Sequence, residues 1–550
     1  MKRLPIIAAA AAGLALMAGA ATRSPKTQIA RNLDIFNTVY KEIQTFYVDS
    51  IDAEKSITTA INAMLSDIDP YTEYIPEKEQ AQFRTMTSGE YGGIGSIIQQ
   101  RPQGVIIAGP YDGSPAARAG LRPGDLILLI DGDSVTSLTT DKVSERLKGP
   151  QGTNVSVTLK RPYVTTADSV FAVDIRREKI QIPSVPYWGV TPDNVGYISL
   201  NSFTEKSYPE VRAAAEELLR RKVSGIILDL RGNGGGLVES AVQILGLFLP
   251  KGTTVLNTRG KGVLDEKVYK TSISPLDTKI PLAVLIDGAS ASASEIVTGA
   301  LQDLDRAVVI GNRSFGKGLV QSTRQLPYDG LLKVTVAKYY IPSGRLIQAI
   351  DYSHRNPDGS VARIPDSLTN VFHTAAGREV RDGGGITPDI KVEYPDLNRL
   401  TYNIIRDQWA FDFATKYASE HTSIPAPADF VVTDSIYDEF IAFIDPDKFN
   451  YDKVCETAMD QLRKFAEAEG YMTDSTRTQF DILAGMLRHD LRHDLLQNRD
   501  NISPYIASEI ISRYYFDAGE IENSILTDRA VDSARTILTS PRYNAILAKP

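Results

Sequence analysis

The sequence of 550 residues contains a single cysteine, Cys455, so no intramolecular disulfide can form and the fold must rest on its hydrophobic cores. Apolar neighbours of this residue, Val454 and Met459, predict a buried structural thiol. Histidine is almost as rare, since there are five and all lie C-terminal to the serine and lysine motifs described below. Long runs of one charge are also absent, and the net charge is −8. This pattern gives no sign of a nucleic-acid partner.

Two of the histidines, His489 and His493, have the spacing of a zinc motif on one face of a helix. Asp490 stands where the metalloprotease motif has glutamate, and its side chain is one methylene shorter. It would therefore reach a zinc-bound water poorly. We interpret this segment as a charged, solvated helix face, and we expect neither a metal nor a cofactor.

The N-terminus has the pattern of a secretory signal peptide. Met1-Lys2-Arg3 is basic, the residues up to Ala21 are rich in alanine and leucine, and Ala18-Gly19-Ala20 offers a small-x-small cleavage site. An uncleaved membrane anchor is the alternative, but alanine is a poor membrane-spanning residue. The sequence therefore predicts a cleaved signal peptide at 1–20 and export to the periplasm of a bacterial envelope.

The length predicts several domains, because single cores rarely exceed about 250–300 residues. Residues 29–87 are expected to be helical, since Ile35, Val39, Ile43 and Tyr47 recur every four residues. This stretch is interpreted as a small cap or as a dimerisation arm, which would make the protein a homo-oligomer.

Residues 88–180 change to short apolar runs separated by glycine turns and resemble a PDZ domain. In that family a glycine loop presents consecutive N–H groups to the terminal carboxylate of a peptide, which adds as a strand to the neighbouring sheet edge. The resemblance assigns this role to Ile94, Gly95 and Ser96. Ser96 replaces the bulky apolar residue that is usual there. A β-barrel that uses the glycines only for turns and binds no peptide is the alternative.

Residues 181–395 alternate strand-like and helix-like stretches, which predicts an α/β core with parallel crossovers. Within it, a strand over Leu282–Ile286 and a helix over Ala293–Asp303 enclose a turn of small residues. A hydroxyl in that turn lies at a helix N-terminus, where N–H groups are unpaired and the helix dipole favours negative charge. Three serines alternate there, and the local sequence leaves them nearly tied as a nucleophile: Ser290, Ser292 and Ser294.

A second motif, Asp229-Leu-Arg-Gly-Asn-Gly-Gly-Gly236, follows a predicted strand and opens a predicted helix. Phosphate-binding loops share this setting. However, the Gly-Lys-Ser/Thr of a Walker loop is absent and the Gly-x-Gly-x-x-Gly frame is not met. The same N–H groups can instead stabilise the oxyanion of an acyl-transfer intermediate. A purely structural turn is the remaining alternative.

A serine nucleophile needs a base, and Lys317 is the candidate in Ser-Phe-Gly-Lys-Gly-Leu-Val-Gln, residues 314–321. Its flanking glycines permit close approach, and the apolar residues nearby could desolvate it. Desolvation lowers the pKa of a lysine and frees the amine to accept a proton. Gln321 could hold that amine by a hydrogen bond. A solvated surface lysine is the alternative interpretation.

Together these motifs resemble the carboxyl-terminal processing peptidases, also called tail-specific proteases. Lys317 follows Ser292 by 25 residues and Gln321 follows four later, as in that family. The likeness covers about residues 35–395 and includes the glycine motif and three further landmarks: Asp69–Pro76, Tyr339–Arg345 and Asp382–Asp389. It implies Ser292 as nucleophile, Lys317 as base supported by Gln321, and an oxyanion hole formed by the N–H groups of Gly236 and Ala293.

The resemblance implies a multidomain α/β protein with a crotonase-like serine-protease core at 181–395, an inserted β-rich PDZ domain and a helical N-terminal segment. Residues 396–550 are expected to form a helical accessory domain, to which the resemblance assigns no partner. The expected activity is that of a serine endopeptidase acting on polypeptides with free, apolar C-termini. A non-catalytic tail-binding scaffold and an acyl-CoA-type crotonase are the rival functions. The intact Ser/Lys/Gln set argues against the scaffold, and the signal peptide and PDZ segment argue against the crotonase.

Overall fold

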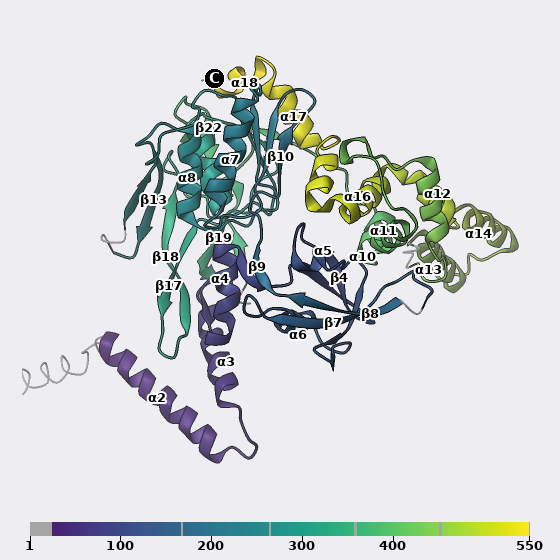
Figure 1. Cartoon of the computed structure of the whole chain (residues 1–550), viewed down its shortest axis with the longest axis horizontal. Helices are drawn as coiled ribbons and strands as arrows, with labels where there is room; N and C mark the ends of the chain where they lie inside the picture. The colour runs from purple at the N-terminus through teal and green to yellow at the C-terminus, as the bar shows by residue number, and fades with distance from the viewer. Residues whose placement is uncertain (1–24, 167–168, 263–265, 357–359, 450–453, 549–550) are drawn as a thin grey trace, which may run out of the picture. The chain divides into compact units, whose positions relative to one another are not determined.

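The computed structural model describes residues 25–548 apart from 167–168, 263–265, 357–359 and 450–453 (Figure 1). The predicted signal peptide at 1–20 lies outside the described residues. Among the described residues, no helix combines the length and the apolar character needed to span a membrane. The described residues fall into two compact units, those up to Pro76 with 323–334 and those of 77–322 with the described part after 334.

In the first unit, the helices α2 (Pro25–Phe46) and α3 (Ala53–Ser66) precede the short strand β1 (Glu73–Ile75). The carboxylate of Asp52 caps α3 by accepting a hydrogen bond from the Lys55 N–H at 3.0 Å. Strand β1 pairs antiparallel with residues 331–333. Helices cover much of the segment 29–87 that was expected to be helical, but β1 lies within it. The four periodic apolar residues are exposed in this chain, with exposed fractions between 44 and 59%: Ile35, Val39, Ile43 and Tyr47.

The second unit begins with η1 (Glu77–Glu79) and α4 (Gln80–Ser88) and continues into a β-rich domain that is bounded by two paired strands. Strand β2 (Glu90–Gly93) leads into this domain and β9 (Glu178–Gln181) leads out, and the two pair antiparallel. Between them lies a sheet of order β3-β4-β5-β7-β8, in which β6 (Asp133–Ser134) pairs with β5. The other strands and the two helices of the domain are β3 (Ser96–Arg101), β4 (Gly104–Pro110), α5 (Pro115–Arg118), β5 (Leu126–Ile130), α6 (Thr140–Leu147), β7 (Asn154–Lys160) and β8 (Val170–Arg176).

The predicted α/β core contains a six-stranded sheet of order β10-β11-β12-β15-β16-β23. Strand β10 (Tyr187–Val190) pairs antiparallel with β11, whereas all other neighbours are parallel. The parallel strands are β11 (Gly196–Ser199), β12 (Ile226–Asp229), β15 (Leu282–Ile286), β16 (Val308–Gly311) and β23 (Ile390–Lys391). The crossover helices are α7 (Ser207–Arg220), α8 (Val238–Phe248) and α9 (Ala293–Asp303). That this core is the spiral of the crotonases stays a prediction.

Both faces of this sheet are covered, which explains why its strands are apolar at every position rather than at alternate ones. In β15, Leu282, Val284 and Ile286 belong to the cluster that includes α7, α8 and α9. The alternate residues, Ala283 and Leu285, belong to a second cluster on the opposite face. That second cluster is completed by α17 (Arg529–Leu538) and α18 (Arg542–Leu547), near the C-terminus. The last helices therefore pack on the six-stranded sheet, although the sequence places them in one accessory domain with residues 396–524.

Further strands flank this core. Strands β13 (Thr254–Gly260) and β14 (Lys267–Lys270) pair with each other, and β13 also pairs with residues 337–340 of β18 (Leu331–Tyr340). Strand β17 (Leu319–Gln325) pairs with β18. Two small hairpins and one short helix follow: β19 (Ile350–Arg355) with β20 (Val361–Arg363), η4 (Asp366–Leu368), and β21 (Val371–His373) with β22 (Glu379–Arg381).

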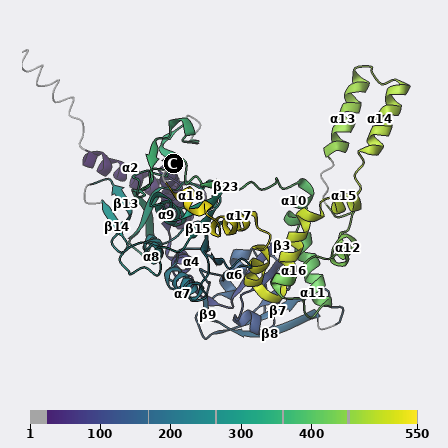
Figure 2. The same ribbon diagram turned by 90° about the horizontal axis from the view of Figure 1, so that it is seen from above.

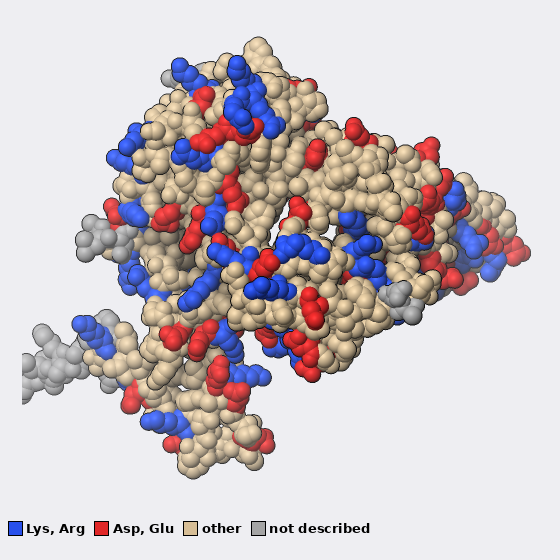
Figure 3. Space-filling view, in the orientation of Figure 1, with Lys and Arg blue, Asp and Glu red and all other residues tan. Residues whose placement is uncertain are grey.

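The helical domain has its own core of aromatic and aliphatic side chains. Its helices are α10 (Arg399–Arg406), α11 (Trp409–Glu420), η5 (Pro427–Asp429), α12 (Asp434–Phe443), α15 (Leu491–Gln497) and α16 (Arg499–Ser524). Helix α16 is interrupted at Phe516, whose φ is 55°. Helices α13 (Val454–Ala468) and α14 (Asp474–Met486) lie side by side as a hairpin (Figure 2). Lys and Arg side chains are interspersed with Asp and Glu on the face of the molecule in Figure 3.

Two expectations for this region are wrong. Cys455 is exposed, because it lies in the α13–α14 hairpin, where few side chains are buried. His489 precedes α15, so it does not share a helix face with His493. The Asp490 carboxylate instead caps that helix, accepting a hydrogen bond from the His493 N–H at 3.1 Å. Asp490 therefore has a structural role as a helix cap.

Candidate active site

Ser292 occupies the turn between β15 and α9, and both elements have the bounds expected from the sequence. Its φ and ψ are 57° and −113°, a conformation that non-glycine residues rarely adopt. Such backbone strain is typical of serines that a strand-to-helix turn presents to a substrate. The following residue, Ala293, is the first of α9, so its N–H has no acceptor within the helix.

The three alternating serines differ in the structure. Ser290 and Ser294 are fully buried. The Ser290 hydroxyl donates to the Leu230 carbonyl at 2.8 Å, and the Ser294 hydroxyl donates to the Asn233 carbonyl at 2.8 Å. Ser292 is only partly buried. The outer two serines thus hold the glycine motif against the turn, and Ser292 is the only one of the three that is partly exposed to solvent.

The glycine motif lies directly against Ser292. A Cβ atom on Gly235 would lie 2.8 Å from the Ser292 Cβ and 2.9 Å from the Ala293 nitrogen. Gly236 has a φ of 144°, and a Cβ there would lie 2.1 Å from the Phe203 carbonyl oxygen. Only glycine permits this approach at both positions. The structure therefore brings Gly235 against Ser292 and the N-terminus of α9, and Gly236, the next residue, against Phe203.

Lys317 lies in the loop between β16 and β17 and is partly buried. A fully buried carboxylate, Glu295, joins this loop to Ser292. It accepts hydrogen bonds from the N–H of Ser292 at 2.8 Å and from the N–H of Lys317 at 2.9 Å. It also accepts from the Ser314 hydroxyl at 2.5 Å and from the Gly316 N–H at 2.7 Å. One side chain therefore sets the distance between the backbones of Ser292 and Lys317.

The environment of Glu295 is unusual for a carboxylate. Burial raises its pKa to about 7, although the four hydrogen bonds act in the opposite direction. This role of Glu295 was not predicted from the sequence. A glutamate three residues after Ser292 is an available signal, but acidic residues are common in the first turn of any helix. Its burial depends on the Lys317 loop, which lies across it.

Tyr339 is a second link between the two backbones. Its hydroxyl donates to the Ser292 carbonyl at 3.2 Å and also contacts the Lys317 carbonyl oxygen. The ring is buried, with 1% of its surface exposed. The sequence marks Tyr339 only as part of a family landmark. Its position at the end of β18 gives that landmark a physical role, because the hydroxyl reaches both the serine motif and the lysine motif.

Gln321 lies on β17, four residues after Lys317, and is partly buried. Its amide nitrogen donates to the Thr335 hydroxyl of β18 at 3.2 Å. This bond fixes the side chain between the two paired strands. The proposed contact of Gln321 with the Lys317 amine stays a prediction.

Ile94 and Gly95 form the loop that enters β3, and Ser96 is the first residue of that strand. Gly95 has a φ of 76°, and a Cβ there would lie 2.6 Å from the Ser114 Cβ. The carbonyls of Ile94 and Gly95 accept from Ala116 at 2.8 Å and Tyr111 at 3.0 Å. Strand β3 is at the edge of its sheet, so its outer edge can accept another strand.

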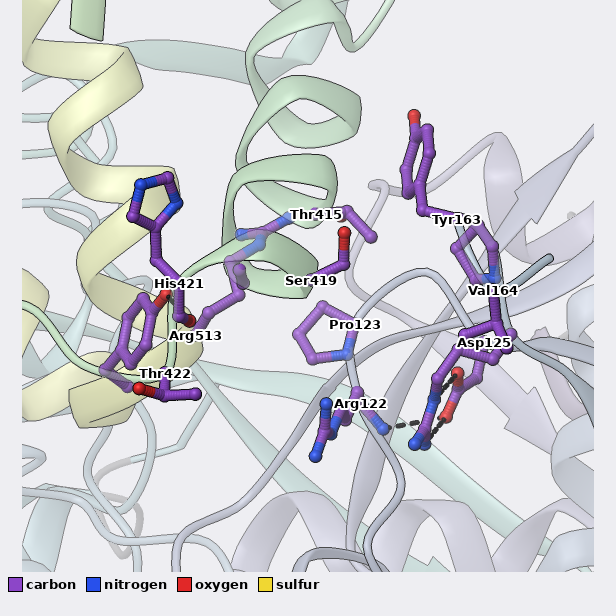
Figure 4. A pocket seen from close by; sticks show the side chains of 14 residues that line it. Arg122, Pro123, Asp125, Tyr163, Val164, Thr415, Ser419, His421, Thr422 and Arg513 are labelled. Carbon is purple, nitrogen blue, oxygen red and sulfur yellow. Dashed lines mark hydrogen bonds and ion pairs between the residues drawn. The ribbon is translucent and has the colours of Figure 1, made fainter. Parts of the chain in front are cut away.

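Two cavities lie away from these motifs, where the β-rich domain contacts the helical domain. One of about 490 Å³ is lined by Arg122, Pro123 and Asp125 on one side and by α11, His421 and Thr422 on the other (Figure 4). Arg161 forms an ion pair with Asp125 at 2.7 Å beside it. A second of about 770 Å³ lies between β3, β4 and α16. Neither is lined by a residue of the serine, lysine or glycine motif.

Comparison with known families finds three matches along the chain. The model for peptidase family S41 matches residues 194–361. The model for a PDZ domain matches residues 106–161. The model for a probable PDZ-protease C-terminal helical domain matches residues 400–538.

Among curated proteins, a carboxy-terminal-processing protease of Bartonella bacilliformis is 37% identical over 375 residues, covering 67% of this chain and 84% of that protein. A probable CtpA-like serine protease of Staphylococcus haemolyticus is 31% identical over 423 residues, covering 76% of this chain and 82% of that protein. A solved photosystem II D1 C-terminal processing protease is 26% identical and covers 65% of this chain and 86% of its own, with a TM-score of 0.36. The PDZ domain of a Vibrio cholerae carboxy-terminal protease, solved with a peptide, is 30% identical over 17% of this chain and 99% of its own, with a TM-score of 0.16.

Proposed function

Because this chain belongs to peptidase family S41, the carboxy-terminal-processing proteases that carry a PDZ domain, we propose that it is an exported serine endopeptidase that selects its substrates by their C-terminal tails. Ser292 is the nucleophile, Lys317 is the base, and Gln321 holds the lysine amine. The N–H groups of Gly236 and Ala293 stabilise the oxyanion.

One observation carries this proposal. Glu295 is bonded at once to the backbone of Ser292 and to the backbone of Lys317, so two motifs far apart in the sequence meet at one point. Gly235 of the glycine motif lies against the same turn, next to the Ser292 Cβ. A partly buried hydroxyl, a lysine on the loop joined to it through Glu295 and the N-terminus of a helix are the parts that acyl transfer requires.

The reaction follows from these parts. The neutral Lys317 amine takes the Ser292 proton as the oxygen attacks the peptide carbonyl carbon. The negative charge that develops on the carbonyl oxygen lies beside the N–H groups of Gly236 and Ala293. When the C–N bond breaks, the Lys317 ammonium gives its proton to the leaving amine. Water then attacks the Ser292 ester, again through Lys317, and releases the carboxylate product.

Tail selection is assigned to the PDZ domain. The N–H groups of Ile94, Gly95 and Ser96 bind the terminal carboxylate, and the peptide adds as a strand to the outer edge of β3. The edge position of β3 supports this mode, as does Gly95, whose positive φ allows the tight turn before the strand. Substrates are therefore polypeptides with free C-termini. Among these, we expect a preference for apolar tails.

The proposal of export rests on the basic residues Lys2 and Arg3 and on the alanine-rich run that follows them. It predicts a periplasmic protein from which residues 1–20 are removed. Cell fractionation followed by N-terminal sequencing of the recovered protein tests this directly. A protein that retains Met1 in the soluble cytosolic fraction would refute export without affecting the proposed chemistry.

The proposed chemistry is tested by incubating the chain and its Ser292→Ala variant with an unstructured protein that has an apolar C-terminus. We expect cleavage by the wild type and none by the variant, at an unchanged melting temperature. Ser294→Ala is the matched control, because it removes a hydroxyl two residues away. It should cost about 1 kcal/mol of stability through its lost hydrogen bond to Asn233 while cleavage continues. Cleavage by Ser292→Ala would refute the assignment.

A further inference from the structure

The C-terminal segment after α16 packs on the six-stranded sheet of the α/β core. Ile525, Val531 and Ile537 are buried against the six-stranded sheet. The Tyr543 hydroxyl donates to the Arg306 carbonyl at 3.0 Å and accepts from the Leu282 N–H at 3.1 Å. This segment is therefore held firmly on the face of the sheet opposite α9.

Asp528 joins this segment to the glycine motif, and its two carboxylate oxygens have different partners. Oδ1 caps α17 by accepting from the N–H groups of Ala530 at 2.8 Å and Val531 at 2.9 Å. Oδ2 accepts from Nη1 of Arg231 at 2.7 Å. Both ends of this ion pair are about one-fifth exposed, so solvent screens it only partly.

Arg231 belongs to the glycine motif and is held on several sides. Its Nε and Nη2 contact the Asp229 carboxylate at 2.5–3.0 Å, and its Nη1 also donates to the Tyr394 hydroxyl at 3.2 Å. The Asp229 carboxylate accepts in turn from the Tyr197 hydroxyl at 2.7 Å. The start of the loop that leads to Gly236 is therefore fixed by a network whose outermost member is Asp528.

We propose that Asp528 is a positioning residue for the peptidase reaction, acting through Arg231 on the loop that presents the Gly236 N–H. The inference rests on the proposed function, because Gly236 matters to the rate only if it stabilises an oxyanion. A donor for an oxyanion must be placed to within a fraction of an ångström, so a small shift of the loop lowers the rate more than it lowers substrate affinity. The C-terminal layer thereby supplies part of the active-site geometry from outside residues 194–361, which the peptidase model matches.

Two substitutions separate this role from helix capping. Asp528→Ser keeps a good N-cap residue but is too short and uncharged to bind Arg231. It should lower kcat by about 10- to 100-fold, with KM changed less than about twofold and the melting temperature nearly unchanged. Asp528→Glu keeps the charge but is a poor cap, so it should retain most of kcat while lowering the melting temperature. Asp532→Asn, on the exposed side of α17, is the matched control and should change neither quantity.

A double-mutant cycle tests whether Asp528 acts through Arg231. Arg231→Gln should lower kcat itself, and adding Asp528→Ser to it should cause no further loss. Additive losses would overturn the proposal, as would wild-type kcat in Asp528→Ser.

Amide hydrogen exchange gives a readout that needs no substrate. In Asp528→Ser, exchange over residues 231–237 should become faster while α17 stays protected. Unchanged exchange over 231–237 would overturn the proposal even if the protein cleaved nothing. A wild type without proteolysis would instead refute the proposed function, so the two failures are distinguishable.

Discussion

Replacing Glu295 by glutamine removes one oxygen from the carboxylate that joins Ser292 to the Lys317 loop. The amide oxygen can still accept from the N–H groups of Ser292 and Lys317, which leaves the amide nitrogen facing Ser314 and Gly316. The Ser314 hydroxyl can rotate to accept from that nitrogen, but the Gly316 N–H cannot. A buried donor without a partner costs about 1–3 kcal/mol, so we expect a folded but destabilised variant with a displaced lysine loop.

The raised pKa of Glu295 predicts how the free energy of unfolding should change with pH in the wild type and in this variant. Burial raises the pKa of Glu295 to about 7 from an ordinary value of 4.5, so the folded chain binds the proton more tightly than the unfolded chain. The resulting stabilisation is complete below about pH 4.5 and is lost as the pH rises to about 7. It amounts to about 3 kcal/mol at ~1.4 kcal/mol for each pH unit. Glutamine has no proton to lose, so the variant should lack this decline.

The measurement is urea unfolding of both proteins at several pH values between 4.5 and 8, together with kcat/KM for a tailed substrate at pH 8. The free-energy difference between wild type and variant should shrink as the pH rises through about 7. Values of kcat/KM should fall at least about 10-fold, since the loop that carries Lys317 is displaced. Glu239→Gln, at an exposed first-turn position of α8, is the control. Parallel stability curves and an unchanged kcat/KM would refute the positioning role of Glu295.

Three other predictions concern the base, the glycine loop and the tail. For the base, kcat/KM should rise with pH as Lys317 loses its proton and should then level off. The His373→Gln variant should show the same pH profile. A rise that disappears in His373→Gln would indicate a different base. For the loop, Gly235→Ala should abolish cleavage, because its Cβ would lie 2.8 Å from the Ser292 Cβ, whereas Gly234→Ala, with no atom within 4 Å, should remain active. Equal activities would contradict the described approach. For the tail, amidating the substrate C-terminus should slow cleavage about 10-fold by removing the recognised carboxylate, and equal rates would refute tail recognition.

Much of the core was predictable because its physical signals are local. The run Leu282–Ile286 is apolar at every position, which is typical of a strand covered on both faces, and the small residues after it lead into α9. The 25-residue separation of Ser292 from Lys317 pointed to Ser292 as the nucleophile, but only through the family resemblance. The local sequence could not separate Ser290, Ser292 and Ser294. Their different burial arises from contacts with the glycine motif, which lies about 60 residues earlier in the chain.

The remaining features depend on contacts between distant segments. Glu295 has the sequence context of an ordinary first-turn glutamate, and Asp528 that of an ordinary helix cap. The first is buried by a loop 19–22 residues further on, and the second bonds to Arg231 across 297 residues. The Cys455 prediction was wrong for a related reason. Apolar neighbours indicate burial only when another element covers that face of the helix, and none of the described residues covers Cys455.

The pairing of β2 with β9 makes the recognition domain replaceable as a module. Gly93 and Glu178 are directly opposite each other in this antiparallel pair, so everything between them leaves and re-enters the core at a single point. Two strands in that relation can be closed by a two-residue turn such as Asn-Gly. A chain that lacks residues 94–177 could therefore keep the catalytic core unstretched, and a foreign peptide-binding domain with adjacent termini could be inserted there. We therefore expect that the domain between β2 and β9 can be exchanged without changing the strands at which the chain leaves and re-enters the core.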